Sequence, residues 1–350
     1  MGDEKIRIGV IGCGLWGPNH VRNFSALPGS EVVAIADTNP DRLRALEAQY
    51  KSLVTFQDYT KLLAYDQLDA VVVATPTGTH APIVRDALLA GRHVLCEKPL
   101  CERAEEGEEL AELAERRSLL LMVGHVFLFN HGILRLKEFI QSGQLGRLYY
   151  ITAKRTNLGP IRGDVNSVYD LAAHDISIMN FLLDEVPERV SAMGQAFLQE
   201  RIEDVVFISM QYPGGVLAHL HASWLDPKKV REITVVGDQK MVTWDDLAAI
   251  GPVSVYNKGI VNQPYYEDFG KFQLLVREGD VTIPHVRMEE PLKVQAQCFL
   301  SYLRGAPIER GTVREGIEVV RVIEAIMKSL AAYGAPVTVN SRRSTSENRI

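Results

Sequence analysis

The sequence predicts a two-domain protein that begins with an α/β domain of Rossmann type, a doubly wound parallel sheet. An α+β domain with an open, mostly antiparallel sheet is expected to follow it. An apolar strand at residues 6–11 that runs into a Gly-x-Gly-x-x-Gly turn, and strands that alternate with helices as far as residue 124, indicate the first domain. Successive strands between residues 189 and 244, without helices between them, indicate the second. We therefore place the domains at residues 1–124 and 125–339, with a polar tail at residues 340–350.

Six strands and the helices between them account for the first domain. Apolar patterns predict strands at residues 6–11, 31–36, 54–56, 69–74, 93–96 and 119–123. Helical patterns follow residue 17 and cover residues 39–50, 82–90 and 104–117. The run DAVVVA at residues 69–74 is apolar throughout, which is typical of a strand that a parallel sheet buries on both faces. This arrangement predicts a complete doubly wound sheet.

The second domain begins with a different pattern. A helix is predicted at residues 133–140, a long alternating strand at residues 147–157 and an amphipathic helix at residues 170–183. Strands are then predicted at residues 189–197, 205–212, 216–224 and 230–236. The last two predicted helices, at residues 288–304 and 312–333, can pack back on the first domain.

The composition is that of an ordinary globular protein with room for two cores. The 350 residues include 46% hydrophobic and 23% charged side chains. A net charge of −6 argues against nucleic acid or an anionic membrane as a partner. No run approaches the roughly 20 apolar residues of a membrane span, and the first strand begins too early for a signal peptide. We expect no metal site, a cytoplasmic location and free thiols at all four cysteines, Cys13, Cys96, Cys101 and Cys298.

The glycine turn at the end of the first strand indicates a dinucleotide site. Gly12 permits the tight turn, Gly14 lets the backbone approach a pyrophosphate, and Gly17 lets the helix lie close to its strand. Leu15 and Trp16 complete the turn, where the amides of the helix N-terminus can meet the phosphate charge. The alternative is an ordinary βα turn without a ligand.

A carboxylate supports the ligand-binding interpretation. Asp37 ends the second strand, 20 residues after Gly17, where such a group hydrogen-bonds the adenosine ribose and repels a 2′-phosphate. The combined spacing therefore predicts a nicotinamide dinucleotide cofactor, with NAD favoured over NADP.

Two further loops follow strands of the same domain. The segment ATPTGTH after the fourth strand supplies hydroxyls and a helix N-terminus that suit a cofactor, although a plain capped turn is compatible with it. Its predicted cofactor contacts are Thr75, Pro76, Thr77 and His80. The segment EKP after the fifth strand adds Glu97 and Lys98, and the proline after Lys98 restricts that residue to extended geometry. By itself, Lys98 fits a surface position and a functional site equally well.

An aspartate and a histidine begin the helix predicted at residues 170–183. Asp170 and His174 are four residues apart, which places them on one helical face. The helix dipole favours the carboxylate and disfavours imidazolium, whereas the charge of Asp170 favours imidazolium. His174 can therefore accept a proton near neutral pH. The alternative is a capping aspartate with a buried, hydrogen-bonded histidine.

Together, these motifs resemble the Gfo/Idh/MocA oxidoreductase family over roughly residues 5–335. The resemblance depends on GCGLWG, ATPTGTH, EKP and D-x-x-x-H, which occur in family order and at family spacing. It implies a Rossmann domain and a second domain whose open sheet builds oligomers, here a homodimer or homotetramer. It also implies catalytic roles for Lys98, Asp170 and His174.

Within that family, three segments look most like the nucleotide-sugar branch, which includes UDP-N-acetylglucosamine and UDP-N-acetylglucosaminuronate 3-dehydrogenases. They are RTNLGP, YDLAAHDISI and HASWLDPKKVR. One departure is GDVNSVY at residues 163–169, where many members have a Gly-rich stretch. Arg155, Asn157 and Asn166 are candidate substrate contacts because they lie at a strand end and in the loop before the helix.

We therefore predict an NAD-dependent dehydrogenase that oxidises a secondary alcohol of a nucleotide-linked sugar, at C3. His174 is the expected base, Asp170 orients it, and Lys98 hydrogen-bonds the reacting oxygen. Three alternatives stay open: a dehydrogenase of a free polyol such as inositol, a deoxysugar-nucleotide ketoreductase, and a dinucleotide-binding regulator without catalysis.

Overall fold

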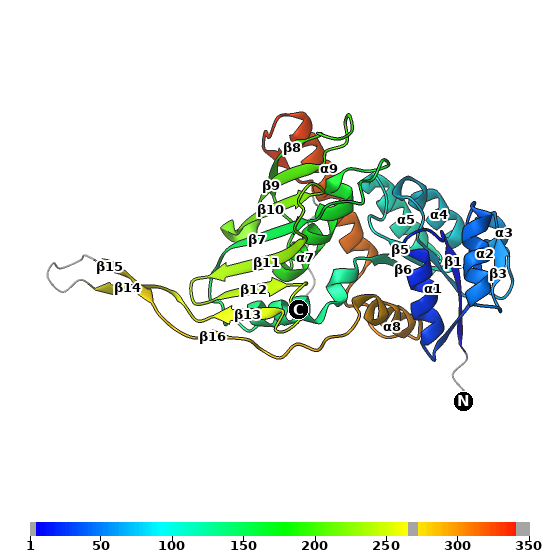
Figure 1. The fold of residues 1–350 in the computed structure, drawn as a ribbon, viewed down its shortest axis with the longest axis horizontal. Helices are drawn as coiled ribbons and strands as arrows, with labels where there is room; N and C mark the ends of the chain where they lie inside the picture. Colours follow the sequence, from blue (N-terminus) through cyan, green and yellow to red (C-terminus); the bar gives the residue numbers. More distant parts are fainter. Residues whose placement is uncertain (1–4, 265–271, 341–350) are drawn as a thin grey trace. The chain divides into compact units, whose positions relative to one another are not determined.

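The computed structural model describes residues 5–264 and 272–340 (Figure 1). The chain divides into two compact units. Unit 1 comprises the chain up to Asn130 together with Glu289–Val320, and unit 2 comprises His131–Met288 together with the chain from Arg321 onward. Helix α9, Val313–Ala331, contributes residues to both units.

Unit 1 contains the predicted parallel sheet. Its six strands lie in the order β3-β2-β1-β4-β5-β6, and every pair is parallel. This order, with the first strand central, confirms the predicted doubly wound Rossmann fold. The strands are β1 Ile6–Ile11, β2 Ser30–Ala36, β3 Val54–Phe56, β4 Ala70–Val73, β5 His93–Glu97 and β6 Leu121–Gly124.

The helices of unit 1 cover its sheet, and their starts follow from local sequence. The Asn39 side chain accepts a hydrogen bond from the amide of Asp41 and so caps α2, whose first residue is Pro40. Far along the chain, α8 packs on α1 through an edge contact between the buried rings of Phe24 and Phe299. The helices are α1 Gly17–Ala26, α2 Pro40–Gln49, α3 Tyr59–Leu63, η1 Thr77–Thr79, α4 His80–Leu89, α5 Ala104–Arg116, η2 Val126–Phe129 and α8 Pro291–Leu303.

Unit 2 contains a nine-stranded sheet in the order β16-β13-β12-β11-β7-β10-β9-β8-β17. All neighbouring pairs are antiparallel except β7 and β10, which confirms a mostly antiparallel sheet and makes it mixed. Its strands are β7 Leu148–Thr156, β8 Arg189–Gln195, β9 Val205–Gln211, β10 Leu217–Ser223, β11 Val230–Gly237, β12 Met241–Asp245, β13 Val253–Tyr256, β16 Val281–Thr282 and β17 Val337–Thr338. A separate hairpin of β14 Gly259–Pro264 and β15 Phe272–Arg277 projects from this unit (Figure 1).

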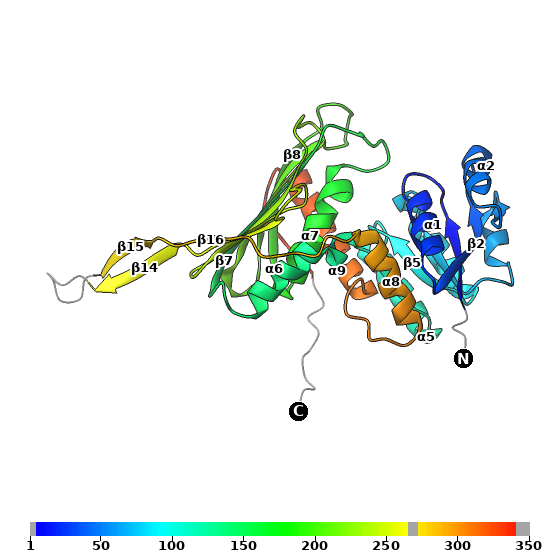
Figure 2. The same cartoon turned by 60° about the horizontal axis from the view of Figure 1, so that its bottom comes forward.

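One face of the unit 2 sheet is covered and the other is open. Helices α6 His131–Gln141 and α7 Ala173–Leu183 lie on the same side of the sheet (Figure 2). On the opposite face Met193 pairs with Phe207 across β8 and β9, and both side chains are exposed. Leu217 and Tyr150 form a second exposed pair across β10 and β7. This face therefore presents apolar side chains to its surroundings.

The prediction of an amphipathic helix at residues 170–183 is wrong in two respects. A π-helical turn, η3 Val168–Ala172, precedes α7, so the α-helix begins later than expected. Most of the α7 side chains are buried rather than divided between two faces, because α7 packs against both α6 and the sheet.

Strands β12 to β17 were not predicted. Apart from Asn340, the predicted polar tail lies outside the described residues.

None of the described helices combines the length and the apolar character that a membrane span requires. Cys13, Cys96, Cys101 and Cys298 form no disulfide bond in the described part of the chain.

Candidate functional site

The glycine turn in unit 1 has a geometry that requires two of its glycines. Gly12 has φ of 94°, and a Cβ atom there would lie 2.6 Å from the carbonyl oxygen of Ala74. A Cβ at Gly17 would lie 2.0 Å from the carbonyl oxygen of Gly12, which no side chain can accommodate. At Gly14 the nearest such contact is 3.8 Å, to the Arg42 side chain, so the backbone there is open. The turn therefore leaves room for a ligand beside the N-terminus of α1.

The two other residues of the turn are accessible. Leu15 is 75% exposed and Trp16 is also exposed, although both are large and apolar. Exposed apolar side chains beside a helix N-terminus suit a ligand with both charged and flat apolar parts, such as a dinucleotide. The residues of the glycine turn therefore fit a dinucleotide.

Asp37 ties the end of β2 to the glycine turn. Its Oδ2 accepts a hydrogen bond of 2.7 Å from the amide of Cys13, and its Oδ1 accepts one of 2.8 Å from the amide of Asn39. The Arg42 guanidinium lies 3.5 Å from Oδ2. A carboxylate oxygen accepts more than one hydrogen bond, so Asp37 retains capacity for ribose hydroxyls.

Burial, with the nearby Asp37 charge, raises the pKa of the Cys13 thiol to about 12, so this thiol stays protonated.

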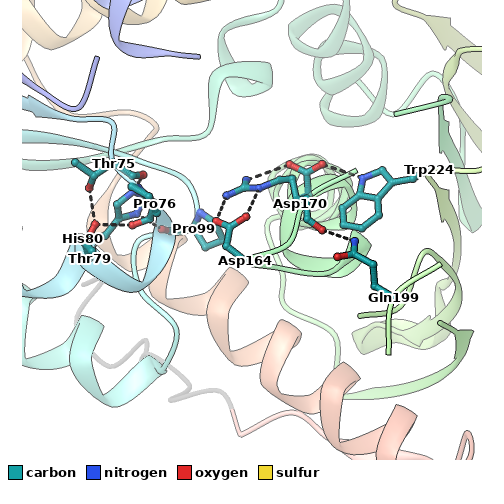
Figure 3. Close-up of polar contacts among 10 residues, drawn as sticks. Thr75, Pro76, Thr79, His80, Pro99, Asp164, Asp170, Gln199 and Trp224 are labelled. Carbon is teal, nitrogen blue, oxygen red and sulfur yellow. Dashed lines mark hydrogen bonds and ion pairs between the residues drawn. The ribbon is translucent and has the colours of Figure 1, made fainter. Parts of the chain in front are cut away.

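The loop after β4 is fixed by a histidine (Figure 3). His80 Nδ1 lies 2.7 Å from the carbonyl oxygen of Pro99, and its Nε2 lies 2.8 Å from that of Thr75. The Thr79 hydroxyl lies 2.7 Å from the carbonyl oxygen of Pro76 and 2.8 Å from the Thr75 hydroxyl. Burial lowers the pKa of His80, although the two carbonyl contacts oppose this effect. In this structure His80 therefore joins the loops after β4 and β5, and its contact with a cofactor stays a prediction.

The remaining residues predicted to contact a cofactor lie near the carboxyl ends of β4 and β5. Thr77 is buried in η1. Glu97 ends β5 and is buried, whereas Lys98, the next residue, is half-buried. Ligands of doubly wound sheets bind beyond these strand ends. Contact of these residues with a cofactor stays a prediction.

In unit 2, Asp170 is held by two donors that the sequence did not identify (Figure 3). The indole Nε1 of Trp224 donates a hydrogen bond of 3.0 Å to Asp170 Oδ2. The Arg162 guanidinium contacts Asp170 Oδ1 at 3.4 Å and also binds Asp164, with 2.9 Å from Nε to Oδ1. Gln199 in turn donates a 2.9 Å hydrogen bond to the carbonyl oxygen of Arg162. The Asp170 carboxylate is therefore fixed from two sides.

His174 lies in the first turn of α7 and is half-buried. The Ser177 hydroxyl donates a 2.7 Å hydrogen bond to its carbonyl oxygen. Asp170 belongs to η3 rather than to α7, so the regular α-helical spacing expected between the two residues is interrupted by the π-helical turn. Such turns occur frequently at functional sites.

The three predicted substrate contacts have partners inside unit 2. Arg155 is buried, and its guanidinium binds Asp175 through two hydrogen bonds of 2.6 and 3.0 Å. Asn157 donates to the carbonyl oxygen of Gly159. The third, Asn166, has several partners. Its amide nitrogen donates to a Glu203 carboxylate oxygen at 2.6 Å, and its oxygen accepts from the amides of Val168 and Tyr169 at the start of η3. Contact of these residues with a substrate stays a prediction.

Of the two residues that were missed, Trp224 and Arg162, the sequence held a weak signal for Trp224 only. Trp224 lies in HASWLDPKKVR, directly after an alternating strand, and a buried indole needs an acceptor for its N–H. Arg162 lies in the loop before η3 and carries no pattern that separates it from other surface arginines.

Among residues 5–264 and 272–340, no cluster of histidine, cysteine or acidic side chains could hold a metal ion.

A doubly wound sheet with this glycine turn, followed by a mixed-sheet unit, is the architecture of a dinucleotide-binding protein. Residues 6–125 match the oxidoreductase family with the NAD-binding Rossmann fold, and residues 133–243 match the GFO/IDH/MocA C-terminal domain. The chain belongs to the GFO/IDH/MocA family of oxidoreductases.

Relatives within this family act on different alcohols. Inositol 2-dehydrogenase 2 of Saccharopolyspora erythraea is 31% identical over 95% of this chain and 96% of its own length. UDP-N-acetylglucosamine 3-dehydrogenase of Acidithiobacillus ferrooxidans is 28% identical over 74% of this chain and 79% of its own length. The solved structure of a putative oxidoreductase from Magnetospirillum magnetotacticum has a TM-score of 0.79 at 28% identity, covering 92% of this chain and 99% of its own. Other inositol dehydrogenases among the relatives align over 54% to 66% of their own length.

Proposed function

We propose that this protein oxidises a secondary alcohol of a nucleotide-linked sugar, at C3, with NAD as the hydride acceptor. The observation that carries the proposal is the fixed Asp170 carboxylate, four residues before His174 and bound by Trp224 and Arg162. A regulator that only binds a dinucleotide has no need to orient an acid–base pair in its second unit.

The preference for NAD rests on Asp37. The carboxylate is held at the end of β2 by two backbone amides, so it cannot easily turn away from a 2′-phosphate. A fixed negative charge there repels a phosphate and accepts hydrogen bonds from ribose hydroxyls. Arg42 beside it reduces this repulsion in part, because its guanidinium lies 3.5 Å from the same carboxylate.

The reaction requires a proton to leave the alcohol as the hydride leaves its carbon. His174 accepts the hydroxyl proton as a general base, and Asp170 orients the imidazole and stabilises its charged form. Lys98 donates a hydrogen bond to the reacting oxygen and offsets its developing negative charge. When bound, the nicotinamide supplies the hydride acceptor.

A pair of lysines favours a nucleotide-linked substrate. Lys228 and Lys229 are exposed in the segment that follows Trp224, and the Thr156 hydroxyl donates a 3.4 Å hydrogen bond to the Lys228 carbonyl oxygen. Two exposed amines, four and five residues after Trp224 in the sequence, suit a diphosphate, which a free polyol lacks. The UDP-N-acetylglucosamine 3-dehydrogenase relative supports the same substrate class.

A free polyol such as inositol is the second candidate. One relative that aligns over 95% of this chain is named for inositol, which favours this alternative. A deoxysugar-nucleotide ketoreductase would use the same three residues in the reverse direction.

The open face of the unit 2 sheet supports assembly into a homodimer or homotetramer. Exposed apolar pairs such as Met193 with Phe207 are a liability in a monomer, and a second copy of the same face would bury them.

A substrate panel tests the proposal. Purified protein is incubated with NAD and UDP-N-acetylglucosamine, its uronate, UDP-glucose or myo-inositol, and NADH formation is followed together with the position of the new ketone. We expect turnover with a UDP-linked sugar and a 3-keto product. Turnover with myo-inositol alone would favour the polyol alternative. If no substrate of the panel led to NADH formation, the dehydrogenase assignment would be opposed.

A further inference from the structure

Glu97 is a carboxylate in a position where burial opposes ionisation. It is 8% exposed and ends β5. The Nε2 atom of His20, a residue of α1 that is 1% exposed, lies 2.8 Å from Oε1. The backbone amide of Lys98 donates a hydrogen bond of 3.3 Å to Oε2. Both carboxylate oxygens therefore have a partner, one from α1 and one from the next residue of the chain.

The neighbouring strand makes room for this carboxylate. Glu97 pairs with Gly124 across β5 and β6. A Cβ atom at Gly124 would lie 3.2 Å from Glu97 Cα and 3.4 Å from its carboxyl carbon. The glycine thus lets the Glu97 side chain fold back over the end of the sheet toward His20.

The surroundings of Glu97 keep it ionised. Burial acts to raise its pKa, but the hydrogen bond from His20 and the charges of His20, Lys98 and His80 lower the pKa below the usual range. Because a carboxylate only accepts hydrogen bonds, His20 Nε2 carries the proton of their contact. The titratable groups that interact electrostatically with Glu97 are His20, His80, Cys96, Lys98 and His125.

We propose that His20 and Glu97 form a positioning pair for Lys98. Through its Oε2 the carboxylate fixes the backbone amide of Lys98, and through its charge it keeps the Lys98 amine protonated. His20 holds the Glu97 carboxylate in the orientation that allows both its hydrogen bond with the Lys98 amide and its effect on the Lys98 amine. This inference rests on the role of Lys98 in the proposed function, and it assigns neither His20 nor Glu97 a contact with the substrate.

Chemical labelling of Lys98 tests the pair without any substrate. An amine-directed reagent is applied across a pH series, and the modified Lys98 peptide is quantified by mass spectrometry. An amine reacts when it is unprotonated, so removal of the nearby negative charge should move the labelling curve to lower pH. For Glu97→Gln we expect a shift of about one pH unit. His20→Leu should produce a smaller shift in the same direction.

Two variants control this experiment. His20→Gln can still donate a hydrogen bond to Glu97 and should restore the curve of the unmodified protein. His93, the first residue of the same strand, accepts a 2.9 Å hydrogen bond from the amide of Leu120 at the opposite end of β5. His93→Gln should lower the melting temperature without moving the Lys98 curve. Glu97→Asp, which keeps the charge, is the matched control for Glu97→Gln and should leave the Lys98 curve in place. If Glu97→Gln does not fold, the shift expected for His20→Leu carries the test.

The outcomes separate this inference from the proposed function. If Lys98→Met retains turnover on the best substrate of the panel, the catalytic role of Lys98 fails, whatever the labelling shows. If Lys98→Met loses turnover while Glu97→Gln and His20→Leu lower only the melting temperature and leave the Lys98 curve unchanged, the pair is structural and the inference is overturned.

Discussion

The indole nitrogen of Trp224 donates a hydrogen bond of 3.0 Å to Asp170, a residue 54 positions earlier in the chain. Trp224 is fully buried at the end of β10, and Asp170 lies in the π-helical turn before α7. A rigid, buried donor of this kind fixes a carboxylate more firmly than a surface side chain can. The relationship makes Trp224 part of the machinery that orients the proposed base.

Replacing Trp224 by phenylalanine should slow turnover and leave the fold largely intact. Phenylalanine keeps most of the buried ring but removes the donor to Asp170. A hydrogen bond to a charged group contributes about 1.5 kcal/mol, which corresponds to about a 10-fold loss in kcat. Trp244→Phe is the matched control, because Trp244 is buried in β12 of the same sheet. Equal kcat values for the two variants would contradict the role of Trp224.

Lys98→Met and His174→Ala should each reduce turnover by a factor of about 10² to 10⁴. Their combined effect should be much smaller than the product of the single effects, because residues that act on one proton and one oxygen work as a unit. NAD binding and melting temperature should change little in each variant. If a stably folded His174→Ala protein kept full activity, His174 would have no part in the mechanism.

Asp37→Ser should narrow the preference for NADH over NADPH. The substitution removes the charge that repels a 2′-phosphate and leaves Arg42, now without its 3.5 Å carboxylate partner, able to attract one. Titration of both cofactors, followed by nucleotide fluorescence, measures the change. Tighter binding of NADPH by the unmodified protein would show that Asp37 has been assigned wrongly.

His125 should make unit 1 sensitive to acid. The residue follows β6 and is 1% exposed, and within the described residues neither ring nitrogen has a hydrogen-bond partner. Burial, with the charge of Lys98, lowers the pKa of His125 to about 4, although Glu97 opposes this. The unfolded chain takes up this proton near pH 6.5, so between about pH 6.5 and about pH 4 the unfolded state binds more protons.

Stability should therefore fall as the pH drops through this range, by roughly 3 kcal/mol from this residue when the full interval is crossed. His125→Phe removes the titration and should flatten the dependence, which urea unfolding of both proteins at a series of pH values would measure. A slope identical to that of the unmodified protein would show that His125 is not the residue responsible.

Assembly should depend on the open face of the unit 2 sheet. Phe207→Glu places a charge among Met193 and the neighbouring exposed side chains and should shift the protein to a smaller species in light scattering. Ile250→Glu is the control, because Ile250 is also exposed but lies in the connection between β12 and β13. A monomeric unmodified protein at micromolar concentration would contradict the proposed oligomer.

The sequence by itself predicted the elements whose signals are local. The strand, glycine turn and helix at residues 6–26 depend on neighbouring residues, since a Cβ atom at Gly17 would meet the carbonyl oxygen of Gly12 in the same turn. The buried run of β4 and the alternation of strand and helix predicted the parallel sheet for the same reason. Lys98 and Asp37 could be located because each directly follows a strand that periodicity identifies.

The tertiary structure decided what joins distant parts of the chain. Nothing in local periodicity pairs Trp224 with Asp170, or His20 with Glu97, because these contacts form only after separate elements have packed together. Packing also made α7 largely buried, where the sequence had predicted two faces, because neighbours on both sides exclude water from it. The amino-acid sequence thus determined which chemical groups lie at the ends of the strands and helices. The packed fold determined which partners orient those groups.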